Sequence, residues 1–248
     1  MTIDHNMDIV ECMAGQYDVS KDFDQYNTML ATRIILPYCF GKRVLEVGCA
    51  TGEMTVELTE AAAELTVLEP SKLYCNIVAE KIADQKKHVP RFVNGFLSDM
   101  PEETPYDVVV LASLLHHLEN PACFLAELKR LIHSGSEVLA TVPNMTSLHR
   151  RIGAKAGLLS DMYGTTLRNN LFNQYGRFDL EQLEDLFCLS GFEVRESYGY
   201  MLKPFSSSQM MLLDLELPMI DALFELGKEF PALASQLFVR AAISKGAI

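Results

Sequence analysis

The sequence lacks any long apolar run, and this absence excludes one class of protein. Nowhere does it contain roughly 18 consecutive apolar residues, the length expected of a helix that spans a membrane. The opening residues MTIDHNMD carry acidic side chains and no apolar stretch of the kind found in a secretory signal peptide. The sequence therefore predicts a soluble protein of the cytoplasm that has no membrane partner.

Paired cysteines are also missing. The cysteines are widely scattered, with no C-x-x-C motif and no Cys/His spacing typical of a structural zinc site. This pattern predicts free thiols in a reducing compartment and no metal centre. The cysteines are Cys12, Cys39, Cys49, Cys75, Cys123 and Cys188.

Basic residues are scarce, since 21 Lys and Arg stand against 33 Asp and Glu and give a formal net charge of −12. An acidic surface repels a phosphate backbone, which disfavours nucleic acid as a substrate. The basic residues that are present concentrate between residues 144 and 178. We expect this segment to form a helical insertion over the open edge of a site.

The stretch from Arg43 to Gly52, RVLEVGCATG, is the most informative part of the chain. A short apolar run ends in a turn with Gly48 and Gly52 four residues apart, and residues 53–58 open a helix. Glycines let the backbone approach a ligand and adopt φ > 0, and the N–H groups at a helix start are free to bind it. The pattern predicts a strand, a tight loop and a helix that seat a nucleotide-like ligand.

Strands and helices alternate along most of the chain. The run YDVVVLA is typical of a parallel strand that is covered on both faces. This alternation predicts a doubly wound α/β fold whose ligand binds beyond the carboxyl ends of the strands. Strands are expected at residues 44–47, 65–69, 91–94, 106–112, 137–142, 192–198 and 236–243, and helices at 22–38, 54–63, 71–86, 121–133, 179–190 and 215–229.

Five motifs in a fixed order resemble those of the class I S-adenosylmethionine-dependent methyltransferases. They are LEVGCATG, VLEP, YDVVVLASLLHHLENP, EVLATVPN and GRFDLEQLEDLFCLSGF, and the nearest group is similar to the ubiquinone and sugar methyltransferases. The resemblance covers residues 22–199 and a final strand near 236–243. It implies a seven-stranded Rossmann-like sheet with its last strand antiparallel, S-adenosyl-L-methionine as cofactor and S-adenosyl-L-homocysteine as product.

Apolar residues make up 49% of the chain and charged ones 22%, which is ordinary globular composition for one domain. On the resemblance we expect a single methyltransferase domain over residues 1–248, a monomer or homodimer acting on a small molecule. Residues 1–40 would form an N-terminal arm and helix, and 41–143 the cofactor-binding half. Residues 144–178 and 200–233 would be insertions on the substrate side.

The resemblance also implies which residues hold the cofactor. Glu46 and the backbone near Gly48 and Gly52 would meet its amino-acid part, and Glu69 would accept hydrogen bonds from both ribose hydroxyls. The other candidates for cofactor contact are Arg33, Cys49, Ala50, Pro70, Phe96, Leu97 and Ala112.

Three of these candidates have open alternatives. Where many relatives have Asp for the adenine amino group, this chain has Phe96, which leaves ring contact, backbone contact by Leu97, or a polar contact by residues 98–99. Ala50 stands where a glycine is commoner in the centre of the turn. Its methyl group would be tolerated if the φ of Ala50 were negative. Arg33 either reaches the cofactor's carboxylate or forms a surface ion pair.

Methyl transfer needs an acceptor aligned with the sulfonium methyl and, for a hydroxyl acceptor, a base. His117 is the family-matched base or substrate-orienting group, and its alternative is to cap the next helix or pack under the loop. His116 is expected to point away, because adjacent positions diverge. Basic residues over the site of an acidic protein would suit an anionic acceptor such as a nucleotide-linked sugar. The candidates for acceptor contact are Tyr17, His149, Arg150, Tyr163, Tyr175 and Tyr198, with Lys203.

Other classes of protein share parts of this pattern. A nicotinamide-dependent oxidoreductase is disfavoured, because Glu53 stands where its third glycine would be. A protein or nucleic-acid methyltransferase is disfavoured by the net charge, and by residues 111–114, LASL, in place of an Asn/Asp-Pro-Pro-aromatic motif. A third alternative stays open, in which the protein binds the cofactor but does not catalyse a reaction.

Overall fold

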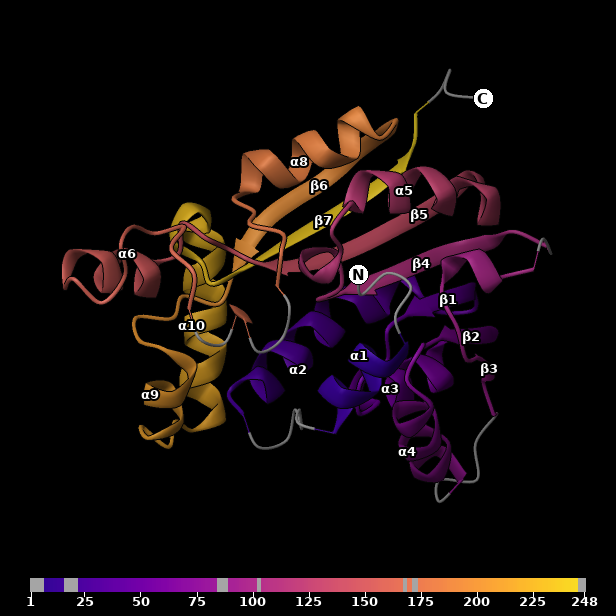
Figure 1. The fold of residues 1–248 in the computed structure, drawn as a ribbon, viewed down its shortest axis with the longest axis horizontal. Coiled ribbons are helices and arrows are strands. Elements are labelled where there is room, and N and C mark those ends of the chain that lie inside the picture. The colour runs from indigo at the N-terminus through magenta and orange to yellow at the C-terminus, as the bar shows by residue number, and fades with distance from the viewer. Residues whose placement is uncertain are drawn as a thin grey trace.

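A mixed sheet of seven strands organises the computed structural model, which describes residues 7–15, 22–83, 89–101, 104–166, 169–170 and 174–244. The strand order is β3-β2-β1-β4-β5-β7-β6 (Figure 1). Strands β1 to β5 are parallel, and β7 lies antiparallel between β5 and β6. The predicted doubly wound Rossmann-like fold with a reversed last strand is confirmed. The strands are β1 (Arg43–Val47), β2 (Glu64–Leu68), β3 (Arg91–Val93), β4 (Tyr106–Ala112), β5 (Ile132–Pro143), β6 (Phe192–Tyr200) and β7 (Gln236–Ile243).

Helices cover both faces of this sheet. The first face carries α2 (Asp24–Ile35), α3 (Glu53–Ala61), α4 (Lys72–Ala83) and α10 (Leu217–Glu229), and the second carries α5 (Pro121–Leu128) and α8 (Leu180–Leu189). Successive strand residues serve opposite faces, so that Val44 packs in the first core and Leu45 in the second. The strands are therefore buried on both sides, as their apolar sequences require.

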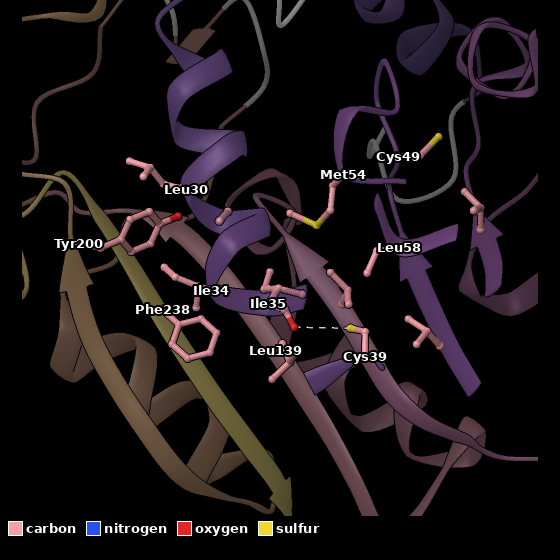
Figure 2. Close-up of a cluster of buried hydrophobic side chains, with 14 of the residues drawn as sticks. Leu30, Ile34, Ile35, Cys39, Cys49, Met54, Leu58, Leu139, Tyr200 and Phe238 are labelled. Carbon is pink, nitrogen blue, oxygen red and sulfur yellow. Dashed lines mark hydrogen bonds between the residues drawn. The ribbon is translucent and has the colours of Figure 1, made fainter. Parts of the chain in front are cut away.

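Helix α2 is fixed firmly to the sheet. Figure 2 shows Leu30 beside Tyr200 of β6 and Ile35 beside Leu139 of β5, and all four side chains are buried. The Cys39 thiol donates to the Ile35 carbonyl at 3.6 Å and so occupies a carbonyl that the end of the helix leaves open. This packing sets the position of the residues that α2 contributes to the site.

Most expected elements are present, but one boundary was wrong. The helix expected at residues 121–133 ends at Leu128, and after a short turn β5 begins at Ile132 instead of residue 137. Ile132 pairs with Tyr106 of β4, and the Ser136 hydroxyl donates to the Tyr106 carbonyl at 2.6 Å. Pairing with a distant strand here outweighs a local helical pattern.

The two insertions differ in how closely they follow expectation. In the first, α6 (Leu148–Lys155) is followed by turns and loop over residues 156–166, so this stretch is less helical than predicted. The second insertion contains α9 (Ser207–Met211) and α10. Of these two helices, only α10 was predicted. Figure 1 shows α6, α9 and α10 gathered at the left of the view. Among the described helices, none has the length and apolarity needed to cross a membrane.

Candidate active site

The turn after β1 has the backbone geometry that its glycines allow. Gly48 and Gly52 have φ of 81° and 86°, and a Cβ on Gly52 would lie 2.6 Å from a methyl group of Val78. Ala50 also has a positive φ, 45°, so the condition of a negative φ, under which its methyl group would be tolerated, is not met. The tight turn between the two glycines holds Ala50 in the left-handed region, at a cost of roughly 1 kcal/mol.

Glu69, which directly follows β2, is a buried acceptor beside this turn. Its two carboxylate oxygens accept separate hydrogen bonds, one from the backbone N–H of Cys49 at 3.0 Å and one from that of Ser71 at 2.8 Å. Burial raises the pKa of Glu69, and the hydrogen bonds from Ser71, Cys49 and Ala50 only partly offset it. Oε2 also accepts the Cys49 thiol at 3.6 Å, a weak bond that a ligand's hydroxyl group could replace.

Glu46 of β1 is a second buried carboxyl, 2% exposed. Burial, and then the nearby charge of Glu69, raise the pKa of Glu46 to about 8. One of its oxygens, Oε2, accepts no hydrogen bond from the described residues. A buried carboxyl of this kind gains most from a cationic or donating ligand.

Both carboxyls face a cavity of about 280 Å³ at the carboxyl ends of the strands. Its wall also includes residues that follow β4, the meeting point of β5 and β7, and one side of α2. Among the predicted cofactor and catalytic residues, the wall contains Glu46, Gly48, Cys49, Ala50, Glu69, Pro70, Ala112 and His117. Gly52 belongs to the same turn and is not part of the wall, and neither are Arg33, Phe96 and Leu97.

The order of the strands spreads these groups across the cavity. Glu69 follows β2, Glu46 belongs to β1, and Ala112 ends β4, with Pro143 and Gln236 paired beyond them on β5 and β7. The two carboxyls therefore mark one side of the cavity, and the ends of β5 and β7 mark the other. A cofactor held by the carboxyls would leave the second side open to another molecule.

The loop expected to hold adenine lies against Glu69, but Phe96 and Leu97 of this loop contact other parts of the protein. The Asn94 amide donates to the carbonyls of Glu69 at 3.0 Å and Pro70 at 2.8 Å. The Phe96 N–H donates to the Asp99 carboxylate at 2.8 Å, and Leu97 is buried in the second core. Adenine contact by Phe96 and Leu97 stays a prediction.

His117 lines the cavity from the 3-10 turn Leu115–His117. The next helix, α5, is capped by Asn120, whose side chain accepts the Cys123 N–H at 3.0 Å, so His117 is not its cap. His116 also lines the cavity, and its ring lies 4.1 Å from the His117 ring, centroid to centroid. The expectation that His116 points away was wrong, because this short turn stacks the two rings.

Two arginines of the first insertion, Arg150 and Arg177, bind other residues of the same segment. The Arg150 guanidinium is buried and donates to the carbonyls of Met162, at 2.5 Å, and Gly164. Arg177 donates to the Tyr163 carbonyl at 2.6 Å, and the Tyr163 hydroxyl donates to the Asp179 carboxylate at 2.8 Å. These contacts hold the loop over residues 161–165, and none of its predicted contact residues lies in the cavity wall.

The other described candidates for acceptor contact are also not part of the cavity wall. Burial, with the charges of Lys203 and Arg150, lowers the pKa of His149 to about 2. Tyr175 is 43% exposed, and Tyr198 of β6 packs on Phe238 at 5.2 Å between ring centroids. Lys203 donates to the Ser207 hydroxyl at 2.9 Å, and Tyr17 lies outside the described residues.

Arg33 forms the ion pair that was its open alternative. Its guanidinium lies 2.7 Å from the Asp221 carboxylate, and about half of each side chain is exposed. It also lies 5.8 Å from the centre of the Phe224 ring. These contacts tie α2 to α10 at the surface, away from the cavity wall.

Residues near the N-terminus and on α2 are part of the site and were missed. Val10 of α1 (Met7–Ala14) lines the cavity, and the neighbouring Glu11 carboxylate accepts the Ser71 hydroxyl at 2.8 Å and the Lys72 N–H at 2.6 Å. Asn27 and Thr28 of α2 also line the wall. The signal available was polar Asn27 at a buried helical position, whereas nothing local to Glu11 indicates its partner.

The titratable side chains of the described residues form no cluster suited to a metal ion. No group of three or more His, Cys, Asp or Glu among them could hold one.

Comparison with known proteins agrees with this geometry. Residues 45–138 match the family model described as a methyltransferase domain. The ubiquinone biosynthesis O-methyltransferase of Maricaulis maris is 27% identical over 110 residues, 43% of this chain and 42% of that protein. The tRNA U34 carboxymethyltransferase of Idiomarina loihiensis is 30% identical over 107 residues, 41% of this chain and 33% of that protein. The matches thus span less than half the length of these two relatives.

A solved structure extends the likeness over nearly the whole chain. The magnesium protoporphyrin IX methyltransferase of Synechocystis PCC 6803, with bound S-adenosylhomocysteine, superposes with a TM-score of 0.62 at 14% identity, covering 92% of this chain and 88% of that one. Identity this low shows the fold alone. With the domain match, it confirms the predicted resemblance to the class I S-adenosylmethionine-dependent methyltransferases.

Proposed function

We propose that this protein is an S-adenosylmethionine-dependent methyltransferase that acts on a small molecule. The observation that carries the proposal is the pair of buried carboxyls, Glu46 and Glu69, on one side of a cavity that has His117 in its wall. The matched domain spans residues 45–138 and so includes all three residues.

The residues of the cavity suit this cofactor. Glu69 would accept the two ribose hydroxyls, because it is a buried carboxyl in the cavity wall and a hydroxyl is a stronger donor than the Cys49 thiol on its Oε2. Glu46 would meet the ammonium group, since its Oε2 accepts no hydrogen bond from the described residues and a cation would favour its ionised form. The glycine turn lets the backbone approach the amino-acid part. When bound, the cofactor supplies an electrophilic methyl group on a sulfonium.

The acceptor would enter on the other side of the cavity, where β5 and β7 end. His117 lies between the two sides, after β4, and would orient the acceptor or take its proton. Alignment of an oxygen or nitrogen lone pair with the methyl group provides most of the rate enhancement in such a reaction. The protein's main task is to hold two molecules in line and exclude water.

The contacts of the described basic residues do not support the prediction that the acceptor is anionic. It depended on the basic residues of 144–178, and the described arginines Arg150 and Arg177 donate to backbone carbonyls of their own segment. The described cavity wall contains Asp24, Glu46, Glu53 and Glu69 and no lysine or arginine. We therefore propose a small-molecule acceptor without requiring an anionic group, in a cytoplasmic protein whose six cysteines are free thiols.

A nucleic-acid substrate is the second candidate, because one of the relatives is a tRNA carboxymethyltransferase. The net charge of −12 argues against it, since RNA binding needs a basic surface. Transfer of label from the cofactor to RNA would favour this candidate.

Titration calorimetry with S-adenosylhomocysteine tests the cofactor assignment. We expect one molecule to bind per chain, and Glu69→Gln to weaken binding by about 10-fold or more, because bonds to a charged acceptor are worth about 1.5–3 kcal/mol. The exposed Glu57 of α3 provides the matched control, and Glu57→Gln should leave the affinity unchanged. No binding to the folded wild-type protein, or equal effects of the two variants, would overturn the assignment.

A further inference from the structure

A chain of amide groups leads from the first insertion to His116. The Thr166 backbone N–H donates to the Asn169 side-chain oxygen at 2.8 Å, and the Asn169 amide nitrogen donates to the Gln174 side-chain oxygen at 2.6 Å. The Gln174 amide nitrogen lies 3.4 Å from Nε2 of His116. The insertion therefore contacts the cavity wall through a defined series of hydrogen bonds.

The direction of this series is fixed at its first member. A backbone N–H only donates, so the Asn169 group facing it is the oxygen, and the Asn169 nitrogen faces Gln174. The Gln174 nitrogen is then the group that faces His116, and it too only donates. Nε2 of His116 must accept, which makes the ring neutral and places its proton on Nδ1, a buried atom with no hydrogen-bond partner among the described residues.

The surroundings of His116 agree with a neutral, fixed ring. The residue is only 4% exposed, and burial, with the nearby charge of His117, holds its pKa well below its usual value. The Gly176 N–H donates to the His116 carbonyl at 2.9 Å, and a Cβ on Gly176 would lie 2.9 Å from the His116 Cα. Segment 174–176 therefore packs directly on His116 and restrains it from both side chain and backbone.

The fixed ring is the surface on which His117 lies. The ring centroids are 4.1 Å apart with an angle of 40° between the planes, and the His117 N–H donates to the Leu114 carbonyl at 2.8 Å. Any change in the tautomer or plane of His116 would shift the imidazole that faces the cavity.

We infer that His116 is a positioning residue for His117, held as the neutral Nδ1–H tautomer by Thr166, Asn169 and Gln174. The inference rests on the proposed function, in which His117 serves the acceptor. A neutral ring beneath His117 leaves His117 as the member of the pair that accepts a proton, because two stacked cations repel. The insertion is thereby a structural support for the base.

The pH dependence of His117 also depends on the other ionisable groups around the cavity. They come from α2, β1, α3, α4 and the end of β2, and they stay unchanged in variants of Gln174. These groups are Asp24, Glu46, Cys49, Glu53, Glu69 and Tyr74.

Nitrogen NMR of histidine-labelled protein, loaded with S-adenosylhomocysteine, tests the inference without any acceptor. We expect His116 to show a protonated Nδ1 and an unprotonated Nε2 at every pH between about 5 and 9, and any protonation of the pair to appear on His117. Gln174→Leu keeps the bulk of the side chain and removes the donor, so it should mix the tautomers of His116 and shift the titration midpoint of His117. Asn170→Ala, at an exposed neighbouring position, is the control and should leave both rings unchanged.

A protonated Nε2 on His116, or unchanged ring signals in Gln174→Leu, would overturn the inference. Once an acceptor is known, Gln174→Leu should move the pH profile of kcat by the same amount as the NMR midpoint of His117, with KM for the cofactor unchanged. If the wild-type protein does not bind S-adenosylhomocysteine, the proposed function is overturned instead. Failure of the inference about His116 and failure of the proposed function are therefore distinguishable.

Discussion

A carboxyl group with a pKa of about 8 is unusual, and Glu46 has one because it is fully buried near a second carboxyl. Between its ordinary value of 4.5 and this one, the folded protein holds a proton on Glu46 that the unfolded chain releases. Stability therefore falls as pH rises through this window, because the folded state binds more protons. A site that costs stability while empty regains it when a cation binds.

The variant Glu46→Gln should remove this dependence. Its thermal midpoint, without ligand, should exceed that of the wild type by several degrees at about pH 8 and approach it near pH 5. Thermal unfolding across this range measures the difference, with Glu57→Gln as the control for a lost surface charge. Parallel pH curves for Glu46→Gln and the wild type would contradict the account of Glu46.

The two small residues of the turn after β1 should respond in opposite directions. Gly52→Ala brings a Cβ to 2.6 Å from Val78 at a φ of 86°, so it should destabilise the fold by about 1–3 kcal/mol. Ala50→Gly relieves a positive φ and should be neutral or stabilising by up to about 1 kcal/mol. Denaturant unfolding of both variants measures this, and a more stable Gly52→Ala would show that the turn geometry is wrong.

At the scale of elements, helix α1 is joined to α4 through Glu11. The Glu11 carboxylate accepts the Ser71 hydroxyl and the Lys72 N–H at the start of α4, where an anion is stabilised by the free N–H groups and the helix dipole. Ser71 follows Glu69 and Pro70, and Val10 lines the cavity. The contact therefore places α1 beside the proposed ribose site.

Loss of this contact should speed the release of the cofactor product. We expect Glu11→Gln to raise the dissociation rate of S-adenosylhomocysteine about threefold to tenfold, because the charge that holds α1 is gone. Stopped-flow displacement measures the rate, and Glu80→Gln, at an exposed position on α4, is the control. An unchanged rate would mean that α1 does not restrain the ligand.

The elements also show which parts of the structure were predictable. Strand β4, the cap of α8 at Asp179 and helix α10 follow from local patterns, and the structure has each of them. Strand β5 begins earlier than its local pattern indicates, since Ile132 pairs with a strand distant in sequence. Local periodicity reports burial and capping, but pairing partners depend on the whole sheet.

At the scale of the whole molecule, the order of the motifs was enough to predict the sheet and the cavity at its carboxyl edge. The predicted residues on strand ends, such as Glu46 and Glu69, line that cavity. The predicted residues of the insertions do not, because Arg150 finds its acceptors in nearby carbonyls that composition cannot reveal. Topology fixes where strand ends meet, whereas each side chain of an insertion has many available partners.

The net charge of −12 belongs to this scale as well, and it bears on the acceptor. A strongly acidic surface disfavours long polyanions such as nucleic acids. The described cavity wall, with its carboxyls and no lysine or arginine, agrees with that expectation.

Transfer of a labelled methyl group shows whether the protein methylates a small molecule. The purified protein is incubated with methyl-labelled S-adenosylmethionine and a cell extract, which is then separated into small molecules, RNA and protein. We expect label in the small-molecule fraction, formed together with S-adenosylhomocysteine, and we expect this label to be lost in Glu69→Gln but not in Glu57→Gln. Label confined to RNA or protein, or no transfer by a protein that binds the cofactor, would contradict it.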